Sequence, residues 1–206
     1  MKQRLGLVVF LAALCWLLPA ATAMTAGASE LLPGGMMAAP AGCATPPAGS
    51  TPESQAQALM AAVNAFRADN GLLPVSYNRI LANAALGHSQ DMSQNNFFSH
   101  TGSNGSTMQQ RLLQAGYTNH EWAGELLAAG QTDPSLIVQQ WSQSPAHRYV
   151  LLNDGLHEIG VGYVYDPNDQ PNVRLDNGQI AGPFCFYWTM DGGYRPGWVH
   201  LPLLLR

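Results

Sequence analysis

Late in the chain the hydrophobic pattern changes its period, and this change constrains the fold more than any other feature. Apolar side chains recur at every second position over 159–165 and again over 184–190. A period of two places alternate side chains on opposite faces of an extended strand, so both stretches predict β-strands. The polar segment between them, 166–182, predicts a loop with a turn at Asn177-Gly178.

Earlier in the chain, apolar residues follow the helical period instead. Thr51-Pro52 offers an N-cap and a proline at the first helical position, and Asn70-Gly71 offers a stop, so a first helix is predicted between them. Further helices are predicted over 79–94, over 107–115 and from 133 onward. Because the strands follow the helices rather than alternate with them, the sequence predicts a single α+β domain.

The first residues have the pattern of an export signal. Two basic residues precede a short apolar run over 5–18, and the small-residue triplet Ala21-Thr22-Ala23 follows. This pattern predicts a secretory signal peptide that is cleaved after Ala23, because the apolar run is short for a membrane anchor. An uncleaved anchor is the alternative. We therefore expect a secreted protein, extracellular or periplasmic, without a stable membrane span after cleavage.

The rest of the chain divides by composition. After the signal peptide (1–23), residues 24–53 are rich in Ala, Gly and Pro and predict a flexible linker, followed by a domain over 54–196 and a tail over 197–206. Two cysteines remain after cleavage, Cys43 and Cys185. An exported chain permits a disulfide between them, but two free thiols are the alternative, because the spacing does not show whether the sulfur atoms meet.

The charge of the chain argues against nucleic acid as a partner. The sequence carries 9 basic and 13 acidic side chains, a net charge of −4, and its only lysine lies in the predicted signal peptide. An acidic surface without lysine repels phosphate backbones, and the basic residues form no cluster in the sequence. We therefore expect no nucleic-acid-binding function.

Ionisable residues between 88 and 158 suggest a site. His100, Glu125, His147 and Glu158 could bind a divalent metal or share protons in acid–base chemistry, and His157 is an alternative to Glu158. Their spacings are long and irregular, unlike the paired histidines of a short zinc motif. The sequence also lacks the Gly-x-Ser-x-Gly motif of a serine nucleophile. Residue types alone therefore leave both chemistries open.

Seven short motifs follow one another along the domain. They are Phe97-Phe98-Ser99-His100, Gly105-Ser106-Thr107, Ala115-Gly116-Tyr117, Ala123-Gly124-Glu125, Trp141-Ser142-Gln143-Ser144-Pro145-Ala146-His147-Arg148, Glu158-Ile159-Gly160-Val161-Gly162-Tyr163 and Tyr187-Trp188-Thr189-Met190-Asp191. In this order they resemble the bacterial, SCP-like branch of the CAP superfamily, which groups cysteine-rich secretory proteins, antigen 5 and pathogenesis-related proteins. The resemblance covers roughly residues 55–193.

The resemblance implies a three-layer α-β-α sandwich with a cleft lined by two histidines and acidic residues. Matched position by position, the cleft residues are His100, Glu125, His147 and Glu158. It also makes His100, His147 and Glu125 the candidate ligands of a divalent metal, zinc first and calcium or magnesium next. Glu125 is the candidate catalytic residue.

The sequence departs from the family pattern at two positions beside these residues. Leu126 stands where asparagine usually follows the glutamate, and Ala146 replaces the usual glycine. The second change is mild. The first removes a polar group beside the cleft, which puts metal affinity in doubt.

These features lead us to expect a secreted binding module rather than an enzyme. Its ligand would be a divalent metal or a small molecule such as a lipid or a cell-envelope component. One alternative is a hydrolase of peptide or cell-wall polymer, in which Glu125 activates water. Another is a structural or host-interaction protein in which the four residues only hold the cleft together. The absence of a recognisable nucleophile motif favours the binding module.

Overall fold

The fold is described from a computed structural model that covers residues 31–32, 36–37 and 43–197. The predicted signal peptide with its cleavage site, half of the predicted linker and most of the tail lie outside the described residues. The first helix begins at Pro52, two residues before the predicted domain boundary.

The described part of the chain contains five helices and nine strands. The helices are α1 (Pro52–Asp69), α2 (Arg79–Gln94), α3 (Met108–Ala115), α4 (Pro134–Gln143) and α5 (Pro145–Leu151). The strands are β1 (Leu31–Leu32), β2 (Met36–Met37), β3 (Ser76–Tyr77), β4 (Phe97–Phe98), β5 (Trp122–Ala129), β6 (Glu158–Tyr165), β7 (Val173–Leu175), β8 (Ile180–Ala181) and β9 (Phe186–Tyr194).

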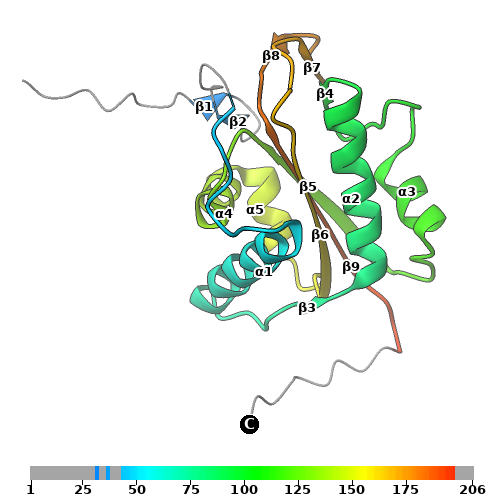
Figure 1. The fold of residues 1–206 in the computed structure, drawn as a ribbon. Coiled ribbons are helices and arrows are strands. Elements are labelled where there is room, and N and C mark those ends of the chain that lie inside the picture. Colours follow the sequence, from blue (N-terminus) through cyan, green and yellow to red (C-terminus); the bar gives the residue numbers. More distant parts are fainter. Residues whose placement is uncertain (1–30, 33–35, 38–42, 198–206) are drawn as a thin grey trace, which may run out of the picture.

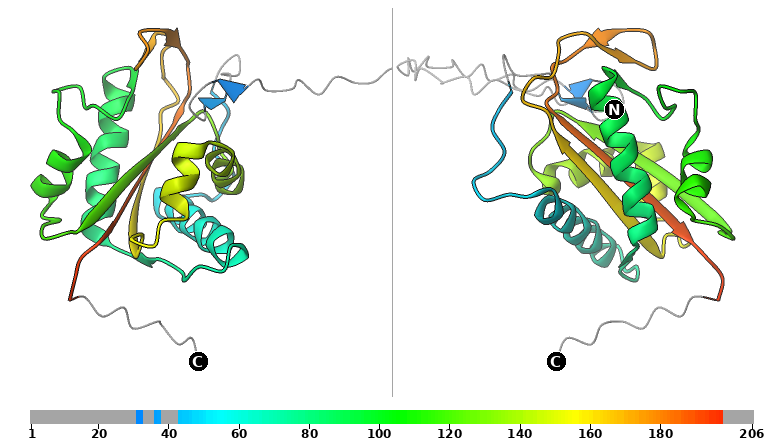
Figure 2. Two further views of the ribbon diagram at one scale, coloured as in Figure 1. Left: turned by 180° about the vertical axis from the view of Figure 1, so that it is seen from behind. Right: turned by 45° about the vertical axis from the view of Figure 1, so that its right-hand side comes forward.

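The central layer is a mixed sheet with the strand order β3-β6-β9-β5. Helices α1, α4 and α5 cover one face of this sheet, and α2 and α3 cover the other (Figure 1 and Figure 2). A smaller sheet, β4-β7-β8, lies beyond one end of α2, and β1 pairs with β2. The predicted α+β class and the three-layer sandwich are therefore confirmed.

Local capping signals fix the helix ends. The Thr51 side chain accepts a hydrogen bond from the Ser54 backbone N–H, and the Ser54 hydroxyl accepts one from the Thr51 N–H. Gly116 ends α3 in the left-handed conformation with φ 95°, which glycine adopts without steric cost. Helix α2 spans the predicted 79–94. These starts and stops were predictable because they depend on neighbouring residues only.

Several elements were not predicted, among them one long strand, one helix and a short strand pair. Strand β5 lies between the two helical layers, and its residues Leu126 to Ala129 are all buried, so the sequence shows an apolar run without alternation. Helix α5 is short and follows α4 after one residue. The segment predicted as a loop, 166–182, contains the antiparallel pair β7 and β8, which turns at Gly178 as expected.

Helix α2 packs unusually close to the sheet. A methyl group at Gly160 would overlap the backbone of Leu81 and Ala82, and one at Gly162 would overlap the backbone of Ala85. The two glycines of β6 thus leave room for the helix backbone. This close packing sets the position of α2, and with it the position of the segment that follows the helix.

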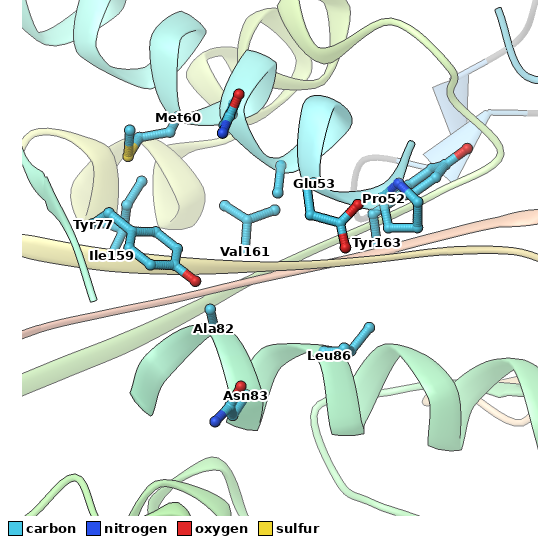
Figure 3. A pocket seen from close by; sticks show the side chains of 12 residues that line it. Pro52, Glu53, Met60, Tyr77, Ala82, Asn83, Leu86, Ile159, Val161 and Tyr163 are labelled. Atoms are coloured by element: carbon cyan, nitrogen blue, oxygen red, sulfur yellow. The ribbon is translucent and has the colours of Figure 1, made fainter. Parts of the chain in front are cut away.

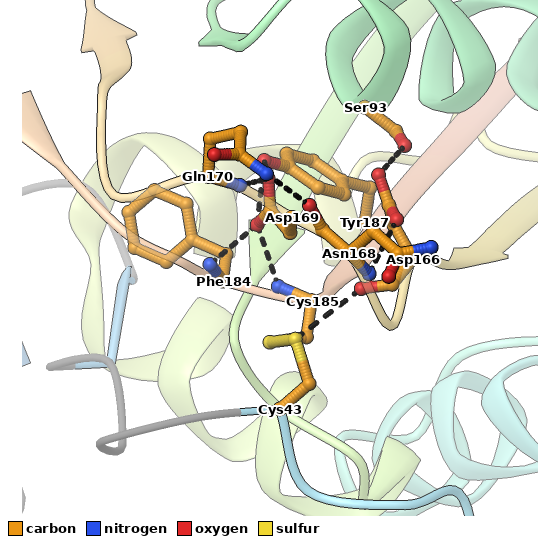
Figure 4. Close-up of a disulfide and its surroundings, with 9 residues drawn as sticks. All are labelled: Cys43, Ser93, Asp166, Asn168, Asp169, Gln170, Phe184, Cys185 and Tyr187. Carbon is orange, nitrogen blue, oxygen red and sulfur yellow. Dashed lines mark hydrogen bonds between the residues drawn. A yellow bond between two sulfur atoms is a disulfide. The ribbon is translucent and has the colours of Figure 1, made fainter.

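A disulfide joins Cys43 to Cys185 (Figure 4). It ties the segment before α1 to the residue before β9, across a separation of 142 residues. The Asp169 carboxylate accepts hydrogen bonds from the backbone N–H groups of Phe184 and Cys185, at 2.6 and 2.8 Å. Cross-links over long loops typically stabilise a fold by about 2–4 kcal/mol, so this bond anchors the N-terminal segment to the core.

The close packing of α2 predicts that Gly160→Ala lowers the free energy of unfolding by about 3 kcal/mol, because the added methyl group meets backbone that cannot yield locally. Gly87→Ala is the matched control. Nothing lies within 4 Å of the methyl group it adds to α2. The control should therefore stabilise the protein by up to about 1 kcal/mol through helix propensity. Urea unfolding measures both changes, and equal stability of the two variants would contradict the packing described.

Candidate functional site

The site is centred on the carboxylate of Glu125, on β5. Its side chain is 2% exposed, and both oxygens have partners. Oε1 lies 2.8 Å from His100 Nδ1, and Oε2 lies 2.5 Å from Arg111 Nη2. A buried carboxylate is costly unless it is paired and hydrogen-bonded, and this pair of contacts meets that requirement.

Arg111 connects three parts of the site. It lies on α3, and its Nη1 donates to the backbone carbonyls of His100, at 3.1 Å, and Ser106, at 3.0 Å. The same guanidinium therefore binds the Glu125 carboxylate and the loop that carries His100. Arg111 is a positioning residue for both side chains.

His100 is the accessible member of the site. It follows β4, and its side chain is 52% exposed although it contacts the buried Glu125. Because the Glu125 carboxylate accepts from Nδ1, the proton of a neutral His100 ring is held on that atom. No hydrogen bond from the described residues engages Nε2, so this atom can meet a ligand.

A second imidazole lies near the first. His147 is on α5, where burial lowers its pKa from the ordinary value and the charge of His100 lowers that pKa further. Its Nδ1 is buried and has no hydrogen-bond partner among the residues described. His100 thus contacts Glu125, and its charge acts on His147, so the three side chains lie in one region of the structure.

Asp191 is an unexpected member of the site. It lies on β9 directly opposite Glu125, is fully buried, and neither oxygen has a partner of good hydrogen-bond geometry in the described part of the chain. Burial raises the pKa of Asp191 well above its ordinary value, and the charge of Glu125 raises that pKa further, against the opposing charge of Arg111. The neutral form of the Asp191 carboxyl is therefore favoured beside the charged Glu125.

Glu125 stays ionised beside this neutral partner. Burial alone would raise the pKa of Glu125, but the hydrogen bond from His100 and the charges of His88 and Arg111 outweigh it and lower that pKa below the ordinary value. His88 is buried under the site, and its Nε2 lies 2.9 Å from the Ser99 carbonyl. Burial lowers the pKa of His88 below its ordinary value.

Glu158 belongs to a different cluster. Its Oε1 accepts from the Tyr117 hydroxyl at 2.8 Å and from Arg195 Nε at 2.9 Å, and its Oε2 accepts from Asn78 Nδ2 at 2.6 Å. Asn78 caps α2, so this carboxylate joins the start of α2 to the end of β9. His157, the alternative to Glu158, packs its ring against Tyr194.

These contacts separate Glu158 from the other predicted site residues. Among the hydrogen bonds of the described residues, none joins it to His100, Glu125 or His147. We therefore assign Glu158 a structural role rather than a place beside the imidazoles.

The residues brought together do not fit a metal centre of three protein ligands. Across the described ranges, no three His, Cys, Asp or Glu side chains are grouped so that they could hold an ion. Both oxygens of Glu125 are engaged, and the Arg111 guanidinium occupies the place that a cation would need. Zinc binding by His100, His147 and Glu125 stays a prediction that this arrangement does not favour.

Sequence reasoning missed Arg111 and Asp191. Arg111 is the only charged residue of its helix, and Asp191 is the only acid of a long apolar strand. A lone charge inside an element that is otherwise uncharged signals a paired group, since such groups are rarely buried without a partner. The partner itself comes from strand pairing and helix packing, which the sequence does not display.

The family model of cysteine-rich secretory proteins (CAP) matches residues 60–191. Two curated proteins of Bacillus subtilis (strain 168) are similar in sequence. The uncharacterized membrane protein YlbC is 35% identical over 99 residues, 48% of this chain and 28% of that protein. The uncharacterized protein YkwD is 36% identical over 102 residues, 49% of this chain and 39% of that protein. Each match thus spans less than half of the relative's length.

A solved structure has a similar fold. It is an extracellular protein of Bacillus anthracis str. Ames that contains an SCP domain, with a TM-score of 0.55 and 25% identity, and the match covers 72% of this chain and 45% of that one. Within the part of our chain that the structure describes, no helix has the length and apolar character that a membrane span requires. With the family model matching most of the domain and a bacterial SCP-domain protein sharing the fold, the chain belongs to the cysteine-rich secretory protein (CAP) family.

Proposed function

We propose that the protein is a secreted, non-enzymatic binding module that takes a small anionic ligand at His100 and His147. The observation that carries the proposal is the half-exposed His100 ring, held from behind by a buried Glu125 whose charge Arg111 balances. A lipid or cell-envelope component with an acidic headgroup is the ligand class that suits such a site.

The charges of the site support an anion. Arg111 offsets the negative charge of Glu125, and the high pKa of Asp191 keeps that second carboxyl neutral. The accessible side of the site, where His100 and His147 lie, therefore carries no uncompensated negative charge. An oxygen-rich anion can accept a hydrogen bond from Nε2 of a doubly protonated His100 ring, whereas a metal ion bound by Glu125 would have to displace Arg111.

The hydrolase alternative receives less support. A general base is most effective when its pKa lies near the working pH, and the pKa of Glu125 is shifted the other way. Both of its oxygens are also hydrogen-bonded, to His100 and Arg111, and the side chain is buried, which limits the access of a water molecule or a substrate proton.

Secretion is proposed on three grounds. The N-terminal sequence has the pattern of a signal peptide over 1–23, and the structure contains the Cys43–Cys185 disulfide, which persists in oxidising compartments. The SCP-domain protein of Bacillus anthracis is described as extracellular. Intact mass of the exported protein tests the proposed cleavage.

Dihexanoyl phosphatidylglycerol is a suitable probe, because its phosphodiester keeps one negative charge between pH 5 and 8. We predict that it binds the protein, and that His100→Ala weakens binding by about tenfold, or ~1.4 kcal/mol. His120→Ala is the control, since His120 is hydrogen-bonded to Gln109 instead. Calorimetry measures both. Absence of binding, or equal binding by the two variants, would contradict the proposal.

The neutral state of Asp191 predicts a pH dependence of stability. Its pKa is higher in the folded than in the unfolded protein, so the folded state loses stability as pH rises above about 4. Asp191→Asn keeps the neutral shape beside Glu125 and Arg111 and removes this loss. The variant should therefore gain stability relative to the wild type as pH rises from 4 to 8, measured by urea unfolding.

Asp176→Asn, at an exposed turn, controls for the loss of one carboxylate and should change stability by no more than about 0.5 kcal/mol. A stability difference between Asp191→Asn and the wild type that does not vary with pH would show that Asp191 is ionised in the folded state.

A further inference from the structure

A pocket separate from the histidine site opens between α1 and α2, beside β6 (Figure 3). Its volume is about 520 Å³. Ala56 and Met60 line it from α1, Leu86 lines it from α2, and Val161 and Tyr163 of β6 lie between the two helices. The pocket therefore runs along the side of a strand and has an apolar wall on each flank.

The strand beside this pocket has an incomplete partner. On the side away from β9, β6 pairs only with the two residues of β3, which oppose Glu158 and Ile159. The chain then leaves the sheet at Asn78, the N-cap of α2. Among the described residues, no strand continues along β6 beyond Ile159.

The backbone groups at this open edge face the pocket. The Ile159 carbonyl accepts a hydrogen bond from the Asn78 N–H at 2.8 Å, so the Ile159 backbone points away from β9. Backbone direction alternates along a strand, so the N–H and C=O groups of Val161 and Tyr163 point the same way. Both residues line the pocket and are only 7% and 5% exposed.

We propose that this pocket binds an extended segment of another polypeptide, which pairs with Val161 and Tyr163 and continues the line of β3. A peptide backbone offers donors and acceptors at the spacing that these groups require. An acyl chain would cover the apolar walls but leave the backbone groups unpaired, which is costly in a buried position.

The charge of the pocket lining indicates the type of one side chain in the bound segment. Glu53, in the first turn of α1, is the only charged residue that lines the pocket as described, and it lies near Tyr163, at the end opposite Tyr77 (Figure 3). Glu53 is exposed and can meet a lysine or arginine of the bound segment. The partner is therefore an extended segment of alternating small apolar residues with a basic residue near one end.

Hydrogen exchange at single amides tests this pairing directly. The probe is a capped peptide, Val-Thr-Val-Lys-Val, added to the full mature protein. In the free protein, the Val161 and Tyr163 amides should exchange faster than those of Gly160 and Gly162, which pair with β9. The peptide should slow exchange of the first pair by about tenfold and leave the second pair unchanged. Protection of Val161 and Tyr163 before any peptide is added would overturn the proposal, because the edge would already be occupied.

Two controls separate strand pairing from apolar adhesion. The same peptide with N-methylated backbone amides keeps its side chains but cannot donate hydrogen bonds, and it should not bind. Asn83→Trp places a large ring in the pocket from an exposed position of α2 and should weaken binding by about tenfold. Gln90→Trp, exposed on the same helix outside the pocket, should leave binding unchanged.

Glu53→Gln should weaken binding of the lysine peptide by about threefold, as expected for the loss of an exposed ion pair. It should leave binding of a peptide with norleucine in place of lysine unchanged. Binding of the N-methylated peptide as tightly as the parent, or displacement of the parent by dodecanoate at equal concentration, would show an acyl or purely apolar site and overturn the proposal.

Discussion

The ion pair between Glu125 and Arg111 determines how the site is built. A carboxylate inside a sheet is expensive to bury, and Arg111 compensates for that cost only because α3 holds it above β5. The same guanidinium binds the backbone of the His100 loop, so the charge balance and the position of the imidazole depend on one side chain. Removing Arg111 would leave the buried charge of Glu125 unpaired, and it would also release the loop that carries His100.

Polar groups are distributed unequally between the two faces of the sheet. The face under α1, α4 and α5 is packed with large apolar side chains, including Trp141 and Trp188. The face under α2 and α3 carries two buried carboxylates, Glu125 and Glu158, each with its own arginine. One carboxylate anchors the loop after β4, and the other anchors the start of α2. The Glu125 and Glu158 carboxylates therefore lie on the α2–α3 side, where His100 emerges.

The elements that could be predicted from the sequence are those whose signals lie within a short stretch of the chain. Helix α2 was predicted from its own apolar stripe, and β6 from its alternation, because both signals are local. Strand β5 was missed because burial on both faces removes alternation. The order of motifs identified His100 and Glu125 but placed Glu158 beside them, whereas the pairing with β9 puts Glu158 opposite Gly193, two residues beyond the position that faces Glu125.

The central claim is that Glu125 holds His100 through Nδ1 and leaves Nε2 for a ligand. Nitrogen-15 NMR of the histidine rings at neutral pH tests it, in the wild type and in Glu125→Gln, before and after addition of equimolar zinc. The account predicts a proton on Nδ1 of His100 in the wild type, unchanged by zinc, and a shift toward the Nε2-protonated form in Glu125→Gln. A proton on Nε2 in the wild type would contradict the account. A change of the Nε2 signal that shows zinc bound to that atom would also contradict it and would favour a metal centre.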